Sequence, residues 1–69
     1  MFLTDRPGPH ARALEAWRDA ANLVSVRWAA FVDAEPMTRQ WAFASYLAAL
    51  DAEEAAAVEL EAMPFRLAA

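Results

Sequence analysis

The chain has 69 residues, with nineteen alanines, one glycine and no cysteine. This length allows one domain at most, and the lack of cysteine excludes disulfides and thiolate metal ligands. The formal net charge is −4, and the six basic residues are all arginines, scattered along the chain. Because a phosphate backbone is bound by clustered basic side chains, we expect no nucleic-acid partner.

The composition also predicts the fold class. Alanine is the strongest helix former, whereas glycine and proline interrupt helices. The single glycine is at position 8 and the prolines are at 7, 9, 36 and 64, so the chain is expected to be all-α. A chain of this length buries only about 60% of the surface its unfolded form exposes, and is marginally stable alone. Oligomerisation, or unusually good helix packing, is the expected supplement.

The first predicted element is a helix over about residues 9–33, after an irregular lead of residues 1–8. Pro9 suits the first helical position, where its missing N–H costs nothing. Apolar residues then recur at alternating spacings of three and four, which predicts the seam of a heptad-like packing surface. This seam consists of Leu14, Trp17, Ala21, Val24, Trp28 and Phe31.

A second stripe follows the seam on one side, and the small residues in it would let a neighbouring backbone come close. The stripe consists of Ala13, Ala16, Ala20, Leu23 and Ala30. Arg27 interrupts it. We expect this side chain either to reach water at the rim of the packed surface or to pair with Asp51 or Glu54, across a hairpin or across a dimer.

The segment from Asp33 to Pro36 is expected to end the first helix, because the residue before a proline is pushed away from helical geometry. Pro36 then suits the first position of a second helix over about residues 36–50. Since the connection is short, the two helices are predicted to form an antiparallel hairpin.

The second helix is apolar on more than one side. Phe43, Leu47 and Leu50 fall together with Tyr46 on their flank, while Trp41, Ala44 and Ala48 fall nearly opposite. A helix that is apolar all round is normally covered all round, so we expect hairpins to pair as a homodimer of the four-helix-bundle type. The expected core and dimer-interface residues are Trp17, Trp28, Trp41, Phe43, Tyr46, Leu47 and Leu50.

Two alternatives remain for the segment after Leu50. Asp51 followed by Glu54 fits a capping box, which predicts a break near Asp51 and a third helix over about 52–63. The apolar side of that helix would hold Ala55, Val58 and Ala62. Abundant alanine and glutamate instead favour one continuous helix. Residues 64–69 are expected to form a tail.

The last three residues of the chain, Leu-Ala-Ala, resemble the end of the bacterial degradation tag that is added to stalled chains. The resemblance implies a protease-adaptor signal, although three such residues also arise by chance in an alanine-rich chain. The use of arginine without lysine indicates a GC-rich genome, and both features favour a bacterial source.

Residues suited to chemistry are sparse. The only histidine is His10, and no nucleophile with a matched acid accompanies it. The glutamates lack the Glu-x-x-His spacing of di-iron bundles, and no glycine-rich phosphate loop is present. We therefore expect no enzyme activity, cofactor or metal. No apolar run reaches the roughly 18 residues of a membrane span, and no signal peptide is evident, so the expected location is cytoplasmic.

Three functional hypotheses follow. The preferred one is a non-enzymatic interaction or scaffolding module that acts as a homodimer, with Trp41 as an aromatic hot spot. The second is a ligand-binding helical bundle with a pocket lined by Trp17, Trp28 or Tyr46. The third is an acidic, antitoxin- or inhibitor-like regulator that covers a basic protein surface. Its partner surface would consist of Asp51, Glu53, Glu54, Glu59 and Glu61.

Overall fold

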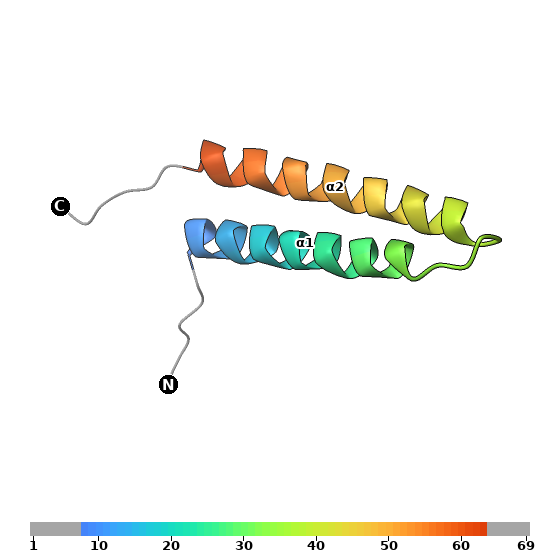
Figure 1. The fold of residues 1–69 in the computed structure, drawn as a ribbon. Helices are drawn as coiled ribbons and strands as arrows, with labels where there is room; N and C mark the ends of the chain where they lie inside the picture. The colour runs from blue at the N-terminus through green and yellow to red at the C-terminus, as the bar shows by residue number, and fades with distance from the viewer. Residues whose placement is uncertain (1–7, 64–69) are drawn as a thin grey trace, which may run out of the picture.

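The computed structural model describes residues 8–63, which form two helices joined by a short turn (Figure 1). Helix α1 spans Pro9–Val32 and helix α2 spans Arg39–Ala62, with 24 residues each. The helices lie side by side and run in opposite directions (Figure 1). The predicted all-α hairpin is therefore confirmed, while the predicted lead and the Leu-Ala-Ala tail lie mostly or wholly outside the described residues.

The two ends of α1 lie close to their predicted positions. Gly8 is the residue that precedes the helix and Pro9 occupies its first turn, as expected. The carbonyl of Gly8 accepts a hydrogen bond from the Arg12 N–H at 3.0 Å. At the other end the helix stops at Val32, one residue before the predicted boundary, and the Asp33 N–H still donates to the Ala29 carbonyl at 3.1 Å.

The start of α2 differs from the prediction by three residues. Pro36 does not open the helix. It sits inside a tight turn in which the Thr38 N–H donates to the Glu35 carbonyl at 3.0 Å. Proline at the second position of such a turn is favourable because its fixed φ matches the turn geometry. The helical hydrogen bonds begin afterwards, with the Ala42 N–H donating to the Thr38 carbonyl at 3.0 Å.

A side chain holds the turn against the end of α1. The Arg39 guanidinium donates from Nη2 to the Ala34 carbonyl at 3.2 Å, and the Thr38 hydroxyl approaches the Glu35 carbonyl at 3.3 Å. These bonds satisfy carbonyl groups that the end of a helix and a turn leave without helical partners. Arg39 thus acts here as a local clip for the connection.

Helix α2 runs without interruption through Leu50 and Asp51. Of the two alternatives for this segment, the continuous helix is the one the structure contains. Alanine and glutamate support helix on both sides of Asp51, and neither glycine nor proline stands there. The local capping signal is therefore outweighed by the propensity of the whole segment.

The continuity of α2 decides which of its side chains face α1. Most of the less exposed positions alternate at spacings of four and three: Ala42, Tyr46, Ala49, Glu53, Ala56, Leu60 and Met63. Leu50, an expected core residue, and Ala57 are half-buried beside this line. The expectation that Ala55, Val58 and Ala62 form the apolar side is therefore wrong, since all three are exposed. A separate third helix could rotate about its own axis and so turn these residues toward α1. In a continuous helix the direction of each side chain is fixed by the preceding turns, in which Ala42 and Tyr46 face α1.

Helix α1 meets α2 largely along the predicted seam. Trp28 stands partly outside this contact, with 47% of its surface exposed. The remaining predicted seam residues are half-buried: Leu14, Trp17, Ala21, Val24 and Phe31.

Very little of the hairpin is fully buried. Among residues 8–63 the only buried hydrophobic residue is Ala49, which is 4% exposed and lies at the middle of α2. Alanines occupy several of the less exposed positions of α2, which lets the helices approach closely between the larger side chains. The interhelical contact is therefore a single narrow line of side chains.

The close approach at Ala49 predicts a strong response to a larger side chain. Ala49→Leu should lower the free energy of unfolding by about 1–3 kcal/mol, because inserted methyl groups must displace α1 or adopt strained rotamers. The matched control is Ala44→Leu, at an exposed position of the same helix, which should leave stability nearly unchanged. Urea unfolding followed by circular dichroism measures both. Equal stability of the two variants would contradict the packing described.

Candidate functional site

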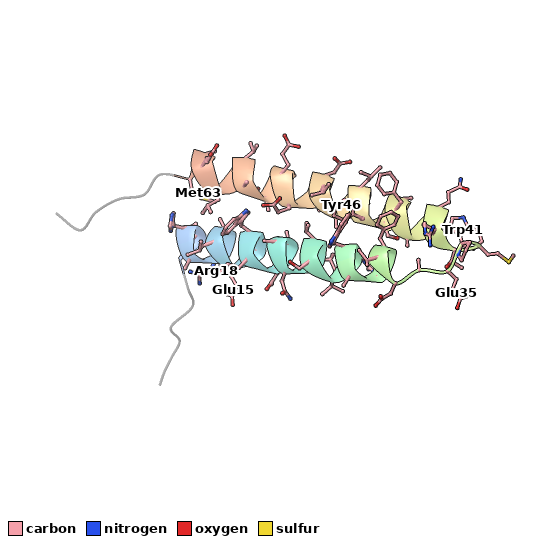
Figure 2. All side chains as sticks on the ribbon, viewed as in Figure 1. Glu15, Arg18, Glu35, Trp41, Tyr46 and Met63 are labelled. Carbon is pink, nitrogen blue, oxygen red and sulfur yellow. The ribbon has the colours of Figure 1, made fainter. Side chains whose placement is uncertain are left out.

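An aromatic cluster bridges the two helices near the turn. It consists of Trp28, Phe31, Phe43 and Tyr46. The ring centroids of Trp28 and Tyr46 lie 5.0 Å apart, and those of Phe31 and Phe43 lie 5.2 Å apart, both in tilted arrangements. Tyr46 points from α2 toward α1 (Figure 2). Such pairs contribute roughly 0.5–1.5 kcal/mol each, so the cluster holds the turn half of the hairpin together.

A second contact joins the helices in their other half. The Trp17 indole Nε1–H donates to the Glu53 carboxylate at 3.1 Å, and both residues are half-buried. Trp17 lies on the predicted seam of α1, and the sequence gave no indication of its partner. Glu53, expected on an acidic outer surface, instead occupies an inward position of α2. A hydrogen bond from an uncharged donor to a carboxylate is among the stronger ones in proteins.

The apolar residues of α2 that lie beside this seam remain in water. Trp41 is 71% exposed, and Phe43 and Leu47 are 42% and 44% exposed. The seam of α2 passes between the two apolar sides recognised in the sequence, so α1 covers neither side completely. In this single chain both sides of α2 present large apolar side chains to solvent.

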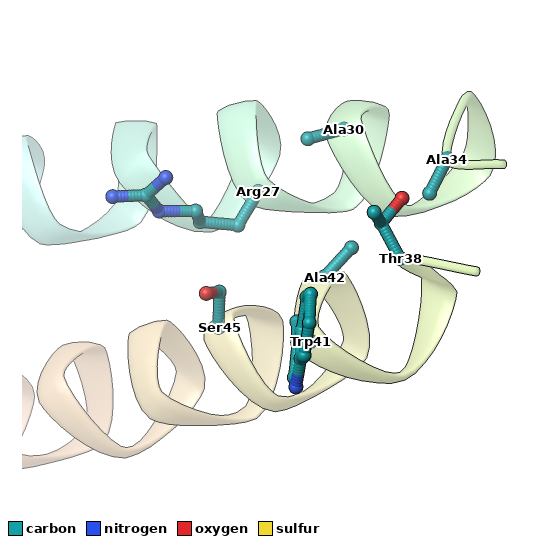
Figure 3. A pocket seen from close by; sticks show the side chains of 7 residues that line it. All are labelled: Arg27, Ala30, Ala34, Thr38, Trp41, Ala42 and Ser45. Atoms are coloured by element: carbon teal, nitrogen blue, oxygen red, sulfur yellow. The ribbon is translucent and has the colours of Figure 1, made fainter.

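One side of the hairpin is hollowed along its length. Near the turn a depression of about 330 Å³ is lined by Trp41, Ala42 and residues of both helices (Figure 3). A second depression of about 200 Å³ continues from it, sharing Arg27 and Ser45. A third, of about 220 Å³, lies at the open end of the hairpin between Ala13, Ala16 and Glu59.

We call this side the groove face. Its residues recur at intervals of seven, which keeps them on one side of each helix. The groove face includes Ala16, Leu23, Arg27 and Ala30 of α1, Ala34 and Thr38 of the connection, and Trp41, Ser45, Ala48, Ala52 and Glu59 of α2. Most are small, so the surface is concave, whereas Leu23 and Trp41 project from it.

Arg27 lies in the middle of the groove face. Its exposed side chain reaches from α1 along the groove (Figure 3). This position agrees with the expected rim location, in which the aliphatic stem covers apolar surface and the guanidinium stays in water.

The expected acidic surface is present without Glu53. The carboxylates of Asp51, Glu54, Glu59 and Glu61 are all exposed, and Glu59 belongs to the groove face. No arginine lies between positions 40 and 63, so the second half of α2 is uniformly negative at neutral pH. These groups do not converge on one point but are distributed around the helix.

The described part of the chain offers little for chemistry. Within residues 8–63 no group of three or more His, Asp or Glu side chains is placed to hold a metal ion. Neither of the two helices combines the length and apolarity required to cross a membrane. The three depressions are open to solvent and are lined by residues other than Trp17, Trp28 and Tyr46.

No protein-family model matches the chain, and neither does a curated protein or a solved structure. Its function is therefore inferred from its own residues.

The Trp17–Glu53 contact yields a quantitative prediction. Trp17→Phe removes the N–H donor and Glu53→Gln removes the charge while keeping an acceptor oxygen. Because the bond is partly exposed, the double-mutant cycle should give a coupling of about 0.5–1.5 kcal/mol in the free energy of unfolding. Chemical denaturation of the four proteins measures it. Additive effects of the two substitutions would show that the charge of Glu53 adds nothing to this bond.

Proposed function

We propose that this chain is a small non-enzymatic interaction module that works as a homodimer, in which two hairpins pack into a four-helix assembly. The observation that carries the proposal is the imbalance between buried and exposed apolar side chains. Ala49 alone is buried in residues 8–63, while Trp41, Phe43 and Leu47 all lie at least 42% exposed. Exposed apolar side chains of this size, here on both sides of α2, mark interaction sites in other proteins.

The energetics favour a partner that extends along both helices. Association costs roughly 4–15 kcal/mol in lost translational and rotational freedom. Full burial of one large apolar side chain returns only about 1.5–3 kcal/mol. Several side chains must therefore be covered together, and a second hairpin of equal length supplies a surface of the required extent.

The same reasoning explains why a second copy is proposed as the partner. A single hairpin of this length has one line of interhelical contacts, and small domains without disulfides or metals commonly obtain the rest of their core from another subunit. The proposal keeps the sequence-based expectations of a cytoplasmic protein that needs no cofactor. A scaffolding role would use the outer surfaces that remain after dimerisation.

A second candidate function is suggested by the uniformly acidic second half of α2. Exposed Asp51, Glu54 and Glu61 would suit a regulator of antitoxin or inhibitor type that covers a basic protein. Binding to such a partner should weaken steeply with added salt, whereas burial of the apolar groove face should not. Salt-insensitive binding would remove this alternative.

Sedimentation equilibrium at micromolar concentration tests the proposed dimer. The wild-type chain should have twice the 7.6 kDa mass of one copy. Trp41→Asp should raise the dissociation constant at least about thirtyfold, the equivalent of a 2 kcal/mol hot spot, and should lower the helix content as the hairpins separate.

The matched control is Val58→Asp, since Val58 is also strongly exposed, at 60%, but does not line the groove face. It should leave the dimer intact. A wild-type chain that sediments as a 7.6 kDa species would overturn the proposed function. A dimer that Trp41→Asp leaves unchanged would remove Trp41 from its interface.

A further inference from the structure

We infer that the groove face is where the second copy binds, and that the two hairpins lie antiparallel there, with their turns at opposite ends of the dimer. This inference rests on the proposed homodimer and adds its surface and orientation. Three observations on the hairpin lead to it: the extent of each candidate face, the arrangement of its projections and hollows, and the distribution of charge along its length.

The first observation is extent. The groove face continues from Ala34 and Thr38 at the turn to Pro9 and Met63 at the open end. On the other side of the seam the apolar surface stops halfway, because Glu54 and Glu61 follow Leu47 at seven-residue intervals and are exposed. The groove face carries small and apolar residues from one end of the hairpin to the other, with Arg12, Arg27 and Glu59 among them, and so offers the longer surface to offset the cost of association.

The second observation is that projections and hollows occur on the same face. A two-fold symmetric interface places one patch against itself, so the patch must be self-complementary. Trp41 projects at the turn end of the groove face, and a hollow lies at the open end, lined by Pro9, Arg12, Ala13, Ala16, Glu59 and Met63. Turning one copy end for end brings each Trp41 over the hollow of the other.

The third observation is charge. The open half of the hairpin, residues 8–20 and 53–63, carries Arg12 and Arg18 against six carboxylates, a net charge of −4. The turn half, residues 21–52, carries Arg27 and Arg39 against three carboxylates, a net charge of −1. A parallel dimer would set the two strongly acidic halves against each other. The antiparallel dimer sets each acidic half against the nearly neutral one, which contains Arg27, and so lowers the repulsion.

The equal lengths of the helices fix the alignment. Both α1 and α2 have 24 residues, so full overlap of two antiparallel hairpins places the symmetry axis at their middle. Ala52 on the groove face lies near that middle, whereas Ala30 lies near the turn. In the antiparallel dimer the two copies of Ala52 are therefore close together, and the two copies of Ala30 are far apart.

The absence of native cysteine makes spin labelling of single-cysteine variants a direct test. Ala52→Cys and Ala30→Cys both replace exposed alanines. Labels at position 52 should lie about 10 Å apart, the spacing of packed helices. Labels at position 30 should lie about 28 Å apart along the axis, from a rise of 1.5 Å per residue over about nine or ten residues on each side of the middle. Ala44→Cys, on the outer side of α2, is the control and should give a long distance.

The possible results separate the orientation from the proposed function. Short distances at both positions 52 and 30 would establish a parallel dimer and overturn the inference. A long distance at position 52 in a protein with the mass of a dimer would place the interface on another face and also overturn it, while leaving the homodimer in place. A monomeric mass for all variants and for the wild type would remove both. Only the short distance at 52 together with the long distance at 30 supports the antiparallel groove-face dimer.

Discussion

A two-helix hairpin has one interhelical surface, so each helix can cover only one side of itself against the other. In this chain that surface is narrow, and alanines such as Ala42, Ala49 and Ala56 occupy several of the inward positions of α2. The arrangement brings the helices together closely and buries Ala49 at the middle of the contact. It leaves the flanks of both helices in water, and the exposed positions of Trp41, Phe43 and Leu47 follow from it.

The two halves of the hairpin are held by different contacts. Near the turn, stacked and tilted rings of the aromatic cluster join the helices, and Arg39 fixes the connection through the Ala34 carbonyl. Toward the open end the joining contact is polar, between Trp17 and Glu53. The same small residues that permit this close packing also leave the groove face concave. The close packing within one copy and the concavity of the groove face thus have a common origin in the alanine content.

The sequence predicts α1 more accurately than α2, for a physical reason. In α1 polar residues such as Asp19 and Asn22 interrupt the apolar ones, so the alternating spacing defines a single seam and the second stripe of small residues. Four residues of that stripe, Ala13, Ala16, Leu23 and Ala30, line the depressions of the groove face. In α2 apolar residues occur on nearly every side, and hydrophobicity alone could not select the phase that turns Ala42, Ala49 and Glu53 inward. Ser45 and Ala52 were missed as groove residues for the same cause.

Short sequence signals for helix ends predicted the structure correctly where a single local interaction favoured one conformation. They were misleading where the same residues suited two conformations. Pro9 begins α1 because a missing N–H costs nothing there. Pro36 is compatible both with the first position of a helix and with the second position of a turn. In the structure it lies in a turn, which the hydrogen bond between Glu35 and Thr38 closes. The capping signal at Asp51 is outweighed by the helix-forming residues on both sides. Which side chains meet across the hairpin, such as Glu53 and Trp17, depends on how α2 is rotated about its axis. The sequence alone does not determine that rotation.

The central claim is that one copy of the hairpin lacks sufficient buried surface and is stabilised by another. The concentration dependence of thermal unfolding tests this claim most directly, because a partner that binds only the folded state raises the midpoint by mass action. Between about 1 and about 100 µM chain, the midpoint measured by circular dichroism should rise by several degrees. A midpoint that stays constant over this range would show that the hairpin is stable alone, and would contradict the account.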